Sequence, residues 1–192
     1  ILATGNGIFF YFEKERVKDL VANQNSALEY NNLELKTIKT NIRDLIDNKK
    51  FYHEGYPGIR DLMILDDKIY VSYNNTPTLE CYNTTIMVSE LNLTNLNFSK
   101  FFTYDECVSK ENKKFQSNGA PATWSGGGKM FTYKDGKILF TIGEYNDRTR
   151  AQNKKSMFGK IFSINLKTKS HELVSMGHRN PQGLFYDKKN DV

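Results

Sequence analysis

The segment richest in side chains that could do chemistry is residues 177–184, which read GHRNPQGL. It places an imidazole, a guanidinium and two amides in a glycine-bounded loop, just before an apolar segment. Arg179 offers a planar fork of donors suited to carboxylate, quinone or carbonyl oxygens, and Asn180 adds both a donor and an acceptor. Such a cluster could hold an anionic, oxygen-rich ligand. The alternative is that these side chains only tie loop backbone groups together.

The other glycine-rich segments do not fit nucleotide binding. A phosphate loop ends in Gly-Lys followed by Ser or Thr, but Met130 follows Gly128-Lys129, and Thr123 stands where the first glycine is required. Residues 5–7 lack the third glycine of a dinucleotide fingerprint, because Phe10 takes its place. We interpret these glycines as turn residues.

Composition favours a folded chain with an ordinary solvated surface. The 192 residues include 27 Lys plus Arg and 22 Asp plus Glu, for a net charge of +5, and 39% are hydrophobic. The positive charge is mostly scattered lysine, which argues against a nucleic-acid partner. No apolar run approaches the roughly 18 residues of a membrane span, and residues 1–12 make a poor signal peptide. We expect a fragment or a processed piece, because the chain lacks an initiator Met and stops within a repeating unit.

The two cysteines, Cys81 and Cys107, lie too far apart for a C-x-x-C redox or zinc motif. Only three histidines are available as co-ligands. The sequence leaves two alternatives open, which are a single disulfide in an oxidising compartment and two free buried thiols.

Short runs of β-branched and aromatic residues between turn signals predict a predominantly β chain. The first complete unit contains four antiparallel strands, at 59–65, 68–73, 84–91 and 96–102. Asp66-Asp67 is its first turn, and a polar loop containing Pro77 and Cys81 follows its second strand. The pattern therefore predicts a four-stranded antiparallel sheet.

A second unit repeats this pattern, with strands at 129–133, 137–143, 160–165 and 171–176. Its first turn contains Asp135-Gly136, a pair that tolerates the positive φ values of a tight hairpin. A polar loop through Arg148 and Lys155 precedes its third strand. Residues 183–187 are predicted to begin a third unit.

Residues 8–12 and 34–38 could be the last strands of an earlier unit, and a helical turn or two could lie within 13–30. Repeated four-stranded units predict a β-propeller, with a β-sandwich as the alternative. The predicted divisions are a blade remnant at about 1–50, blades at about 58–102 and 127–176, and the start of the next blade at about 182–192. A partial array would expose blade faces, so we expect a longer, closed ring.

Residues 177–184 resemble the signature of the glucose/sorbosone dehydrogenase family, which are six-bladed β-propellers that include soluble quinoprotein glucose and aldose sugar dehydrogenases. Three further segments resemble that family in order, at 58–62 (GIRDL), 128–144 (GKMFTYKDGKILFTIGE) and 159–165 (GKIFSIN). The resemblance spans about 55–187.

The resemblance implies an oxidoreductase in which pyrroloquinoline quinone (PQQ), held with calcium, takes a hydride from the C1 carbon of an aldose. In that scheme Arg179 and Asn180 match the pair that contacts the quinone, and the calcium loop lies beyond Val192. The cofactor supplies the redox chemistry, and the protein orients it. The family also implies a periplasmic or secreted protein, a sugar substrate and an external electron acceptor.

Two departures from the family pattern concern the catalytic residues. With Lys129 aligned to the family's arginine, Ser125 stands at the position of the general-base histidine, and a serine cannot abstract a hydroxyl proton as imidazole does. Glu144 stands at the position of the acidic residue that supports this histidine in the family, so the acidic character of that position is preserved. Tyr56 stands where a glutamine would contact the quinone.

Three residues could replace the missing base: His178, His53, and Glu144 if burial raises its pKa. The sequence thus predicts a PQQ-dependent sugar or alcohol dehydrogenase-like oxidoreductase with an altered active site. The alternative is a non-catalytic propeller that binds a carbohydrate or a protein partner. The absent histidine favours this alternative, whereas the Arg179–Asn180 pair and Glu144 favour the enzyme.

Overall fold

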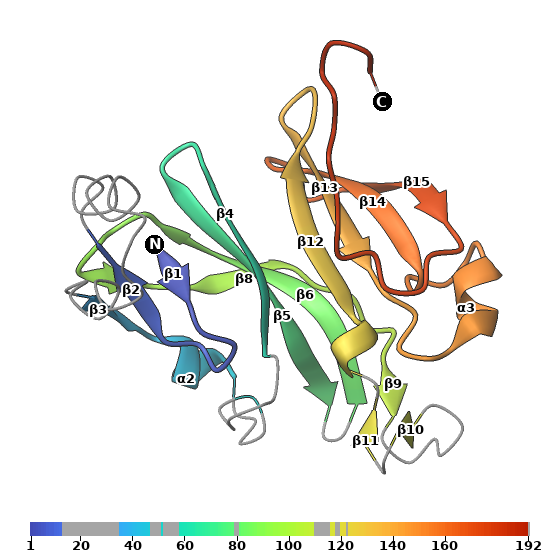
Figure 1. Ribbon diagram of the computed structural model, residues 1–192, viewed down its shortest axis with the longest axis horizontal. Coiled ribbons are helices and arrows are strands. Elements are labelled where there is room, and N and C mark those ends of the chain that lie inside the picture. The colour runs from blue at the N-terminus through green and yellow to red at the C-terminus, as the bar shows by residue number, and fades with distance from the viewer. Residues whose placement is uncertain are drawn as a thin grey trace, which may run out of the picture.

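The computed structural model describes residues 1–12, 35–46, 51, 58–78, 81–109, 116–117, 120–121 and 123–191. The regular elements among them are mostly β-strands, and Figure 1 shows three larger sheets side by side. A separate two-stranded sheet pairs β10 (Gln116–Ser117) with β11 (Ala120–Pro121). The helical elements among them are the helices α2 (Ile42–Leu45) and α3 (Arg148–Gln152) and the 3-10 turn η4 (Thr123–Ser125). None of the described helices has the length and apolar character to cross a membrane.

The first sheet contains the N-terminal strands. Its order is β1 (Leu2–Ala3), β2 (Phe9–Tyr11), β3 (Lys36–Thr40) and β7 (Asn95–Leu96). The strand predicted at 8–12 is present, and the one predicted at 34–38 lies two residues later, at 36–40. The turns expected within 13–30 lie outside the described residues. The parallel pairing of β3 with β7 joins this sheet to a later part of the chain.

The second sheet contains β4 (Ile59–Leu65), β5 (Lys68–Thr78), β6 (Cys81–Glu90) and β8 (Ser99–Phe102), with β9 (Val108–Ser109) beside β6. The structure confirms β4 at both ends, and Asp66 and Asp67 turn with positive φ values of 49° and 55°. The predicted polar loop is wrong, because β5 continues through Pro77 and β6 begins at Cys81. Pro77 is tolerated because it lies in an irregularity of the ladder, where its missing N–H breaks no pairing.

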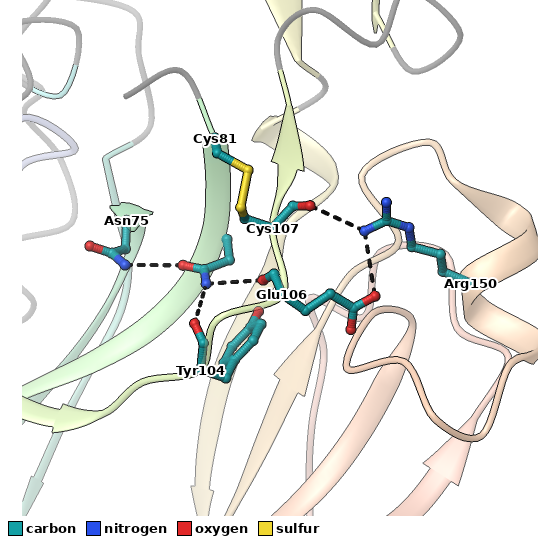
Figure 2. The surroundings of a disulfide bond; sticks show 7 residues. Asn75, Cys81, Tyr104, Glu106, Cys107 and Arg150 are labelled. Carbon is teal, nitrogen blue, oxygen red and sulfur yellow. Dashed lines mark hydrogen bonds and ion pairs between the residues drawn. A yellow bond between two sulfur atoms is a disulfide. The ribbon is translucent and has the colours of Figure 1, made fainter. Parts of the chain in front are cut away.

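The strand predicted at 96–102 is divided between two sheets. Leu96 lies in β7 and pairs with Thr40 of β3, whereas only Ser99–Phe102 pairs with β6. Cys81 and Cys107 form a disulfide with Cα atoms 5.5 Å apart, beside the pairing of β9 with β6 (Figure 2). The structure thus shows a disulfide and not two free thiols.

The third sheet contains β12 (Gly127–Thr132), β13 (Lys137–Ile142), β14 (Lys160–Asn165) and β15 (His171–Met176) in that order. The predicted bounds of β14 and β15 agree with the structure at both ends. The predicted hairpin turn is confirmed, since Asp135 and Gly136 have φ values of 57° and 66°. The loop predicted through Arg148 contains helix α3, whose N-cap Asp147 accepts a hydrogen bond from the Arg150 amide.

The strand predicted at 183–187 does not form. This segment runs back along β12, where Phe185 packs against Phe131 and Tyr186 against Tyr133 with ring centroids 5.4 and 4.6 Å apart. Aromatic contacts hold it there without a ladder of hydrogen bonds. The prediction of a strand at this position is therefore wrong.

The second sheet buries both of its faces. Along β5, Ile69, Val71 and Tyr73 belong to a core shared with the first sheet, while Tyr70 belongs to a core shared with the third sheet. This alternation follows the two-residue period of a strand. A sheet covered on both faces by neighbouring sheets is the arrangement of propeller blades.

Candidate functional site

Three segments meet where the third sheet begins and ends. They are η4, the loop that follows β13, and the loop that follows β15. The Glu144 amide donates to the Arg179 carbonyl at 2.8 Å, and the Tyr145 amide donates to the Ser125 carbonyl at 3.4 Å. The Gly127 amide donates to Oδ1 of Asn180 at 3.1 Å. The structure thus brings together four residues that the sequence analysis singled out, Ser125, Glu144, Arg179 and Asn180.

Gly143 permits the close approach of these segments. A Cβ added at this glycine would lie 1.8 Å from the carbonyl oxygen of Ser125. The Gly143 amide donates to the Gly126 carbonyl at 2.9 Å, which fixes the two backbones side by side. Any side chain at position 143 would therefore push Ser125 and Glu144 apart.

Glu144 is a buried carboxylate, with 3% of its surface exposed. Its Oε1 accepts no hydrogen bond within the described part of the chain. Nε of Arg179 lies 3.7 Å from this oxygen, and the Arg179 side chain is itself 69% exposed. Burial raises the pKa of Glu144, while Arg148 and Arg179 act in the opposite direction. This carboxylate can therefore take up and hold a proton more readily than an exposed one.

Ser125 is buried at the end of η4 and carries no group that ionises near neutral pH. The preceding residue, Trp124, is the single tryptophan of the chain and is 44% exposed. The Trp124 carbonyl accepts a hydrogen bond from Nη2 of Arg60 at 2.9 Å. An exposed tryptophan thus directly precedes Ser125 in the chain.

A hollow of about 370 Å³ opens next to these segments, lined by Ile59, Arg60, Gly127, Lys129 and Gln182. Nε of Arg60 donates to the Gly127 carbonyl at 3.1 Å, and Nζ of Lys129 pairs with Asp61 at 2.8 Å. The hollow therefore lies between the first strands of two sheets and carries two cationic side chains. Sequence reasoning missed Arg60, because its partners lie more than 60 residues away in the chain.

The imidazole of His178 is engaged with β15. Its Nε2 lies 2.9 Å from Oγ of Ser175, and burial lowers its pKa, with a smaller effect from Lys160. His53 and Tyr56 lie outside the described residues. Among the residues that are described, no group of three or more His, Cys, Asp or Glu side chains could hold a metal ion.

Tyr145 is a second residue that the sequence analysis missed. Its buried hydroxyl lies 2.6 Å from Oγ1 of Thr84 and donates to Oδ1 of Asn74 at 3.1 Å. Burial raises the pKa of this phenol well above its ordinary value. It joins the site loop to the second sheet, but its partners are more than 60 residues distant, so no local pattern could have revealed it.

Comparison with solved structures shows the fold. A glucose dehydrogenase is 20% identical, with a TM-score of 0.57 over 69% of this chain and 44% of that chain. The apo-form of the soluble aldose sugar dehydrogenase from Escherichia coli is 20% identical, with a TM-score of 0.51 over 65% of this chain and 37% of that chain. A putative oxidoreductase (glucose dehydrogenase) from Thermus thermophilus is 18% identical, with a TM-score of 0.56 over 82% of this chain and 46% of that chain.

This chain spans less than half the length of each of those structures. The likenesses establish a β-propeller fold. The comparison with curated proteins gave no match. The family model for glucose/sorbosone dehydrogenases matches residues 11–192. Since that match covers nearly the whole sequence, the chain belongs to the glucose/sorbosone dehydrogenase family.

Proposed function

We propose that the complete protein is a PQQ-dependent sugar or alcohol dehydrogenase with an altered active site. The observation that carries the proposal is the exposed Arg179 guanidinium 3.7 Å from the buried Glu144 carboxylate, whose Oε1 accepts no hydrogen bond from the described residues. Family membership and the similarity to a glucose dehydrogenase and an aldose sugar dehydrogenase support sugar oxidation. PQQ, when bound, would accept the hydride that the substrate loses.

The donors of this site fit an anionic quinone. Arg179 presents a planar fork that suits the carboxylate and carbonyl oxygens of such a group. Oδ1 of Asn180 is committed to the Gly127 amide, so the amide nitrogen is the part of this side chain that can donate to a ligand. Calcium is proposed with the cofactor, on ligands beyond Val192.

The residue best suited to accept the substrate's hydroxyl proton is Glu144. A general base works best when its pKa lies near the working pH, and burial moves the pKa of Glu144 in that direction. Ser125 cannot serve, because its hydroxyl does not ionise near neutral pH. The proposed site therefore differs from the family pattern in using a carboxylate where an imidazole is expected.

A second candidate function is a non-catalytic propeller that binds a carbohydrate or a protein partner. The observation that favours it is the buried Ser125 at the position of the base. The exposed Trp124 beside it is of the kind that stacks on sugar rings. In this case Arg179 and Glu144 would bind a ligand without redox chemistry.

The experiment compares the full-length wild-type protein with Ser125→His, each loaded with PQQ and calcium, in sugar-dependent reduction of a dye. We expect the histidine to raise the rate by about tenfold to a hundredfold, because general-base catalysis by a well-placed imidazole contributes at least this much. Glu172→Gln, an exposed change on β15, should leave the rate unaltered. Absence of dye reduction in both wild type and Ser125→His would favour the non-catalytic alternative.

We propose a periplasmic or secreted location, with an external electron acceptor. The disulfide between Cys81 and Cys107 supports it, because disulfides persist in oxidising compartments.

A further inference from the structure

The loop between β13 and β14, residues 143–159, lies between two fixed structures. On one side it contacts the chain around Cys107, and on the other it contacts residues 177–180 after β15. Both sets of contacts are made by hydrogen bonds and ion pairs between residues far apart in the sequence. The loop therefore connects the chain around Cys107 with the segment that carries Arg179.

Glu106 makes the contact on the disulfide side. Its Oε1 accepts from Oγ of Ser156 at 2.8 Å, and its Oε2 accepts from the Met157 amide at 2.6 Å. Its backbone carbonyl accepts from Nδ2 of Asn83 at 3.1 Å. Figure 2 shows the Glu106 carboxylate directed toward Arg150. One carboxylate thus holds the loop at two consecutive residues.

Arg150, on helix α3, reaches back to the same segment. Its Nη1 donates to the Cys107 carbonyl at 3.2 Å and lies 3.4 Å from Oε1 of Glu106 (Figure 2). Its Nε pairs with Oδ2 of Asp147 at 2.7 Å. The Asp147 amide in turn donates to the Glu144 carbonyl at 2.7 Å. A continuous path of polar contacts therefore leads from Cys107 to Glu144.

The far side of the loop holds the segment that contains Arg179. The Gly177 amide donates to the carbonyls of Ala151 and Gly159, and the His178 amide donates to Gly159, each at 3.0 Å. The Glu144 amide donates to the Arg179 carbonyl at 2.8 Å. The loop at residues 143–159 therefore contacts the Glu106 segment on one side and forms hydrogen bonds with residues 177–179 on the other.

We propose that Glu106 and Arg150 are positioning residues that carry the constraint of the Cys81–Cys107 disulfide to the Glu144–Arg179 pair. The disulfide fixes the chain beside Glu106 to the start of β6, and the two charged side chains fix helix α3 to that chain. Charge-assisted hydrogen bonds of partly buried groups are about twice as strong as neutral ones, which suits them to hold a loop in one position. This proposal rests on the proposed function in one respect, which is that the Glu144–Arg179 pair binds a ligand.

The test is amide hydrogen exchange in the full-length protein, with wild type compared with Glu106→Gln. A glutamine can accept from Ser156 or from Met157 but not from both, because its NH₂ group faces one of these donors. We expect exchange at the amides of Glu144, Gly177 and His178 to become at least about tenfold faster, while exchange in β12–β14 stays unchanged. The double variant Cys81→Ser with Cys107→Ser should give the same pattern.

Two further variants separate positioning from general stability. Arg150→Lys keeps the charge but loses the fork, so it should raise exchange at the three amides less than Arg150→Ala does. Glu172→Gln, which changes an exposed ion pair with Lys137 on the same sheet, should leave all three amides unchanged. Equal acceleration throughout β12–β14, or no acceleration at the three amides, would overturn the proposal.

Cofactor affinity provides the second readout. If the wild-type protein binds PQQ, Glu106→Gln should weaken binding by about tenfold without a matching fall in Tm, as expected for the loss of a charge-assisted hydrogen bond that holds the site. If the wild type binds no PQQ, the proposed function fails, and the exchange pattern still decides whether Glu106 and Arg150 position the loop.

Discussion

The Glu144–Arg179 pair consists of a buried carboxylate and an exposed cation, and these two groups contribute differently to stability. The carboxylate has been removed from water without a hydrogen bond from the described residues to its Oε1, whereas Arg179 keeps most of its hydration. Burial without full compensation disfavours the ionised form of Glu144. The carboxylate therefore costs folding stability at neutral pH in the absence of a ligand, as groups at functional sites often do.

The raised pKa of Glu144 predicts the pH dependence of stability. A carboxyl group whose pKa is higher in the folded than in the unfolded state stabilises the fold below the unfolded pKa, and this contribution is lost as pH rises through the folded pKa. A glutamine does not ionise, so the Glu144→Gln variant does not lose this stability as pH rises, whereas the wild type does. The Tm of the variant minus the Tm of the wild type should therefore increase between pH 4 and pH 8. Thermal unfolding at a series of pH values provides the measurement.

Glu172→Gln is the matched control, because hydrogen bonding to Lys137 and its positive charge lower the pKa of Glu172. Its Tm difference should not increase with pH. A Tm difference for Glu144→Gln that is equal at pH 4 and pH 8 would contradict the account of this residue.

The sequence could predict the identities of several site residues but not their partners. Arg179 and Asn180 stand out because the loop that contains them concentrates polar side chains between glycines. Ser125 and Glu144 follow from their spacing to recognisable segments. Arg60, Tyr145 and Glu106 could not be predicted, because each acts on a backbone or side chain at least 44 residues away.

Among the elements, the strands bounded by turn signals were predicted well and those whose ends depend on pairing were not. β14 lies between Gly159 and the turn after Asn165, so local chemistry sets both of its ends. β5 extends to Thr78 because β6 pairs with it along this length. Leu96 leaves its predicted strand because β3 offers a partner in another sheet. Strand ends of this kind are decided by tertiary contacts.

Gly143→Ala tests the element junction at the site. The new methyl group would lie 1.8 Å from the Ser125 carbonyl oxygen, so the backbones of η4 and the loop after β13 must separate. We expect a loss of about 2–3 kcal/mol in the free energy of unfolding, measured by urea denaturation. Gly183→Ala meets no atom within 4 Å and should cost far less. Equal stability of the two variants would show that the junction is not close-packed.

At the scale of the whole molecule, the repeat of four-stranded units predicted an all-β fold but left a β-propeller and a β-sandwich as alternatives, and the similar solved structures decide for the propeller. The sequence could not show how adjacent sheets are joined, since this depends on side chains that meet across the interface. Asp61 on β4 accepts from the Met130 amide on β12 at 2.8 Å and pairs with Nζ of Lys129 at 2.8 Å. This carboxylate therefore connects the first strands of two neighbouring sheets.

Asp61→Ala should destabilise the protein by about 2 kcal/mol, because it leaves a backbone amide at the interface without its acceptor. Glu90→Ala removes an exposed carboxylate, 78% accessible, from its pair with Lys68 within one sheet, and should cost less than about 0.5 kcal/mol. Urea denaturation of the two variants gives both values. A cost for Asp61→Ala as small as that for Glu90→Ala would show that the sheets do not depend on this contact.

The measurement that tests the central claim most directly is a titration of the full-length protein with PQQ, with and without calcium, followed by the absorbance of the quinone. We expect saturable, calcium-dependent binding that Arg179→Ala weakens by about a hundredfold, as the loss of charge-assisted hydrogen bonds implies. Arg179→Lys should restore part of that affinity, because it keeps the charge without the fork. Absence of binding at micromolar PQQ, or an affinity that Arg179→Ala leaves unchanged, would contradict the assignment of a quinone to this site.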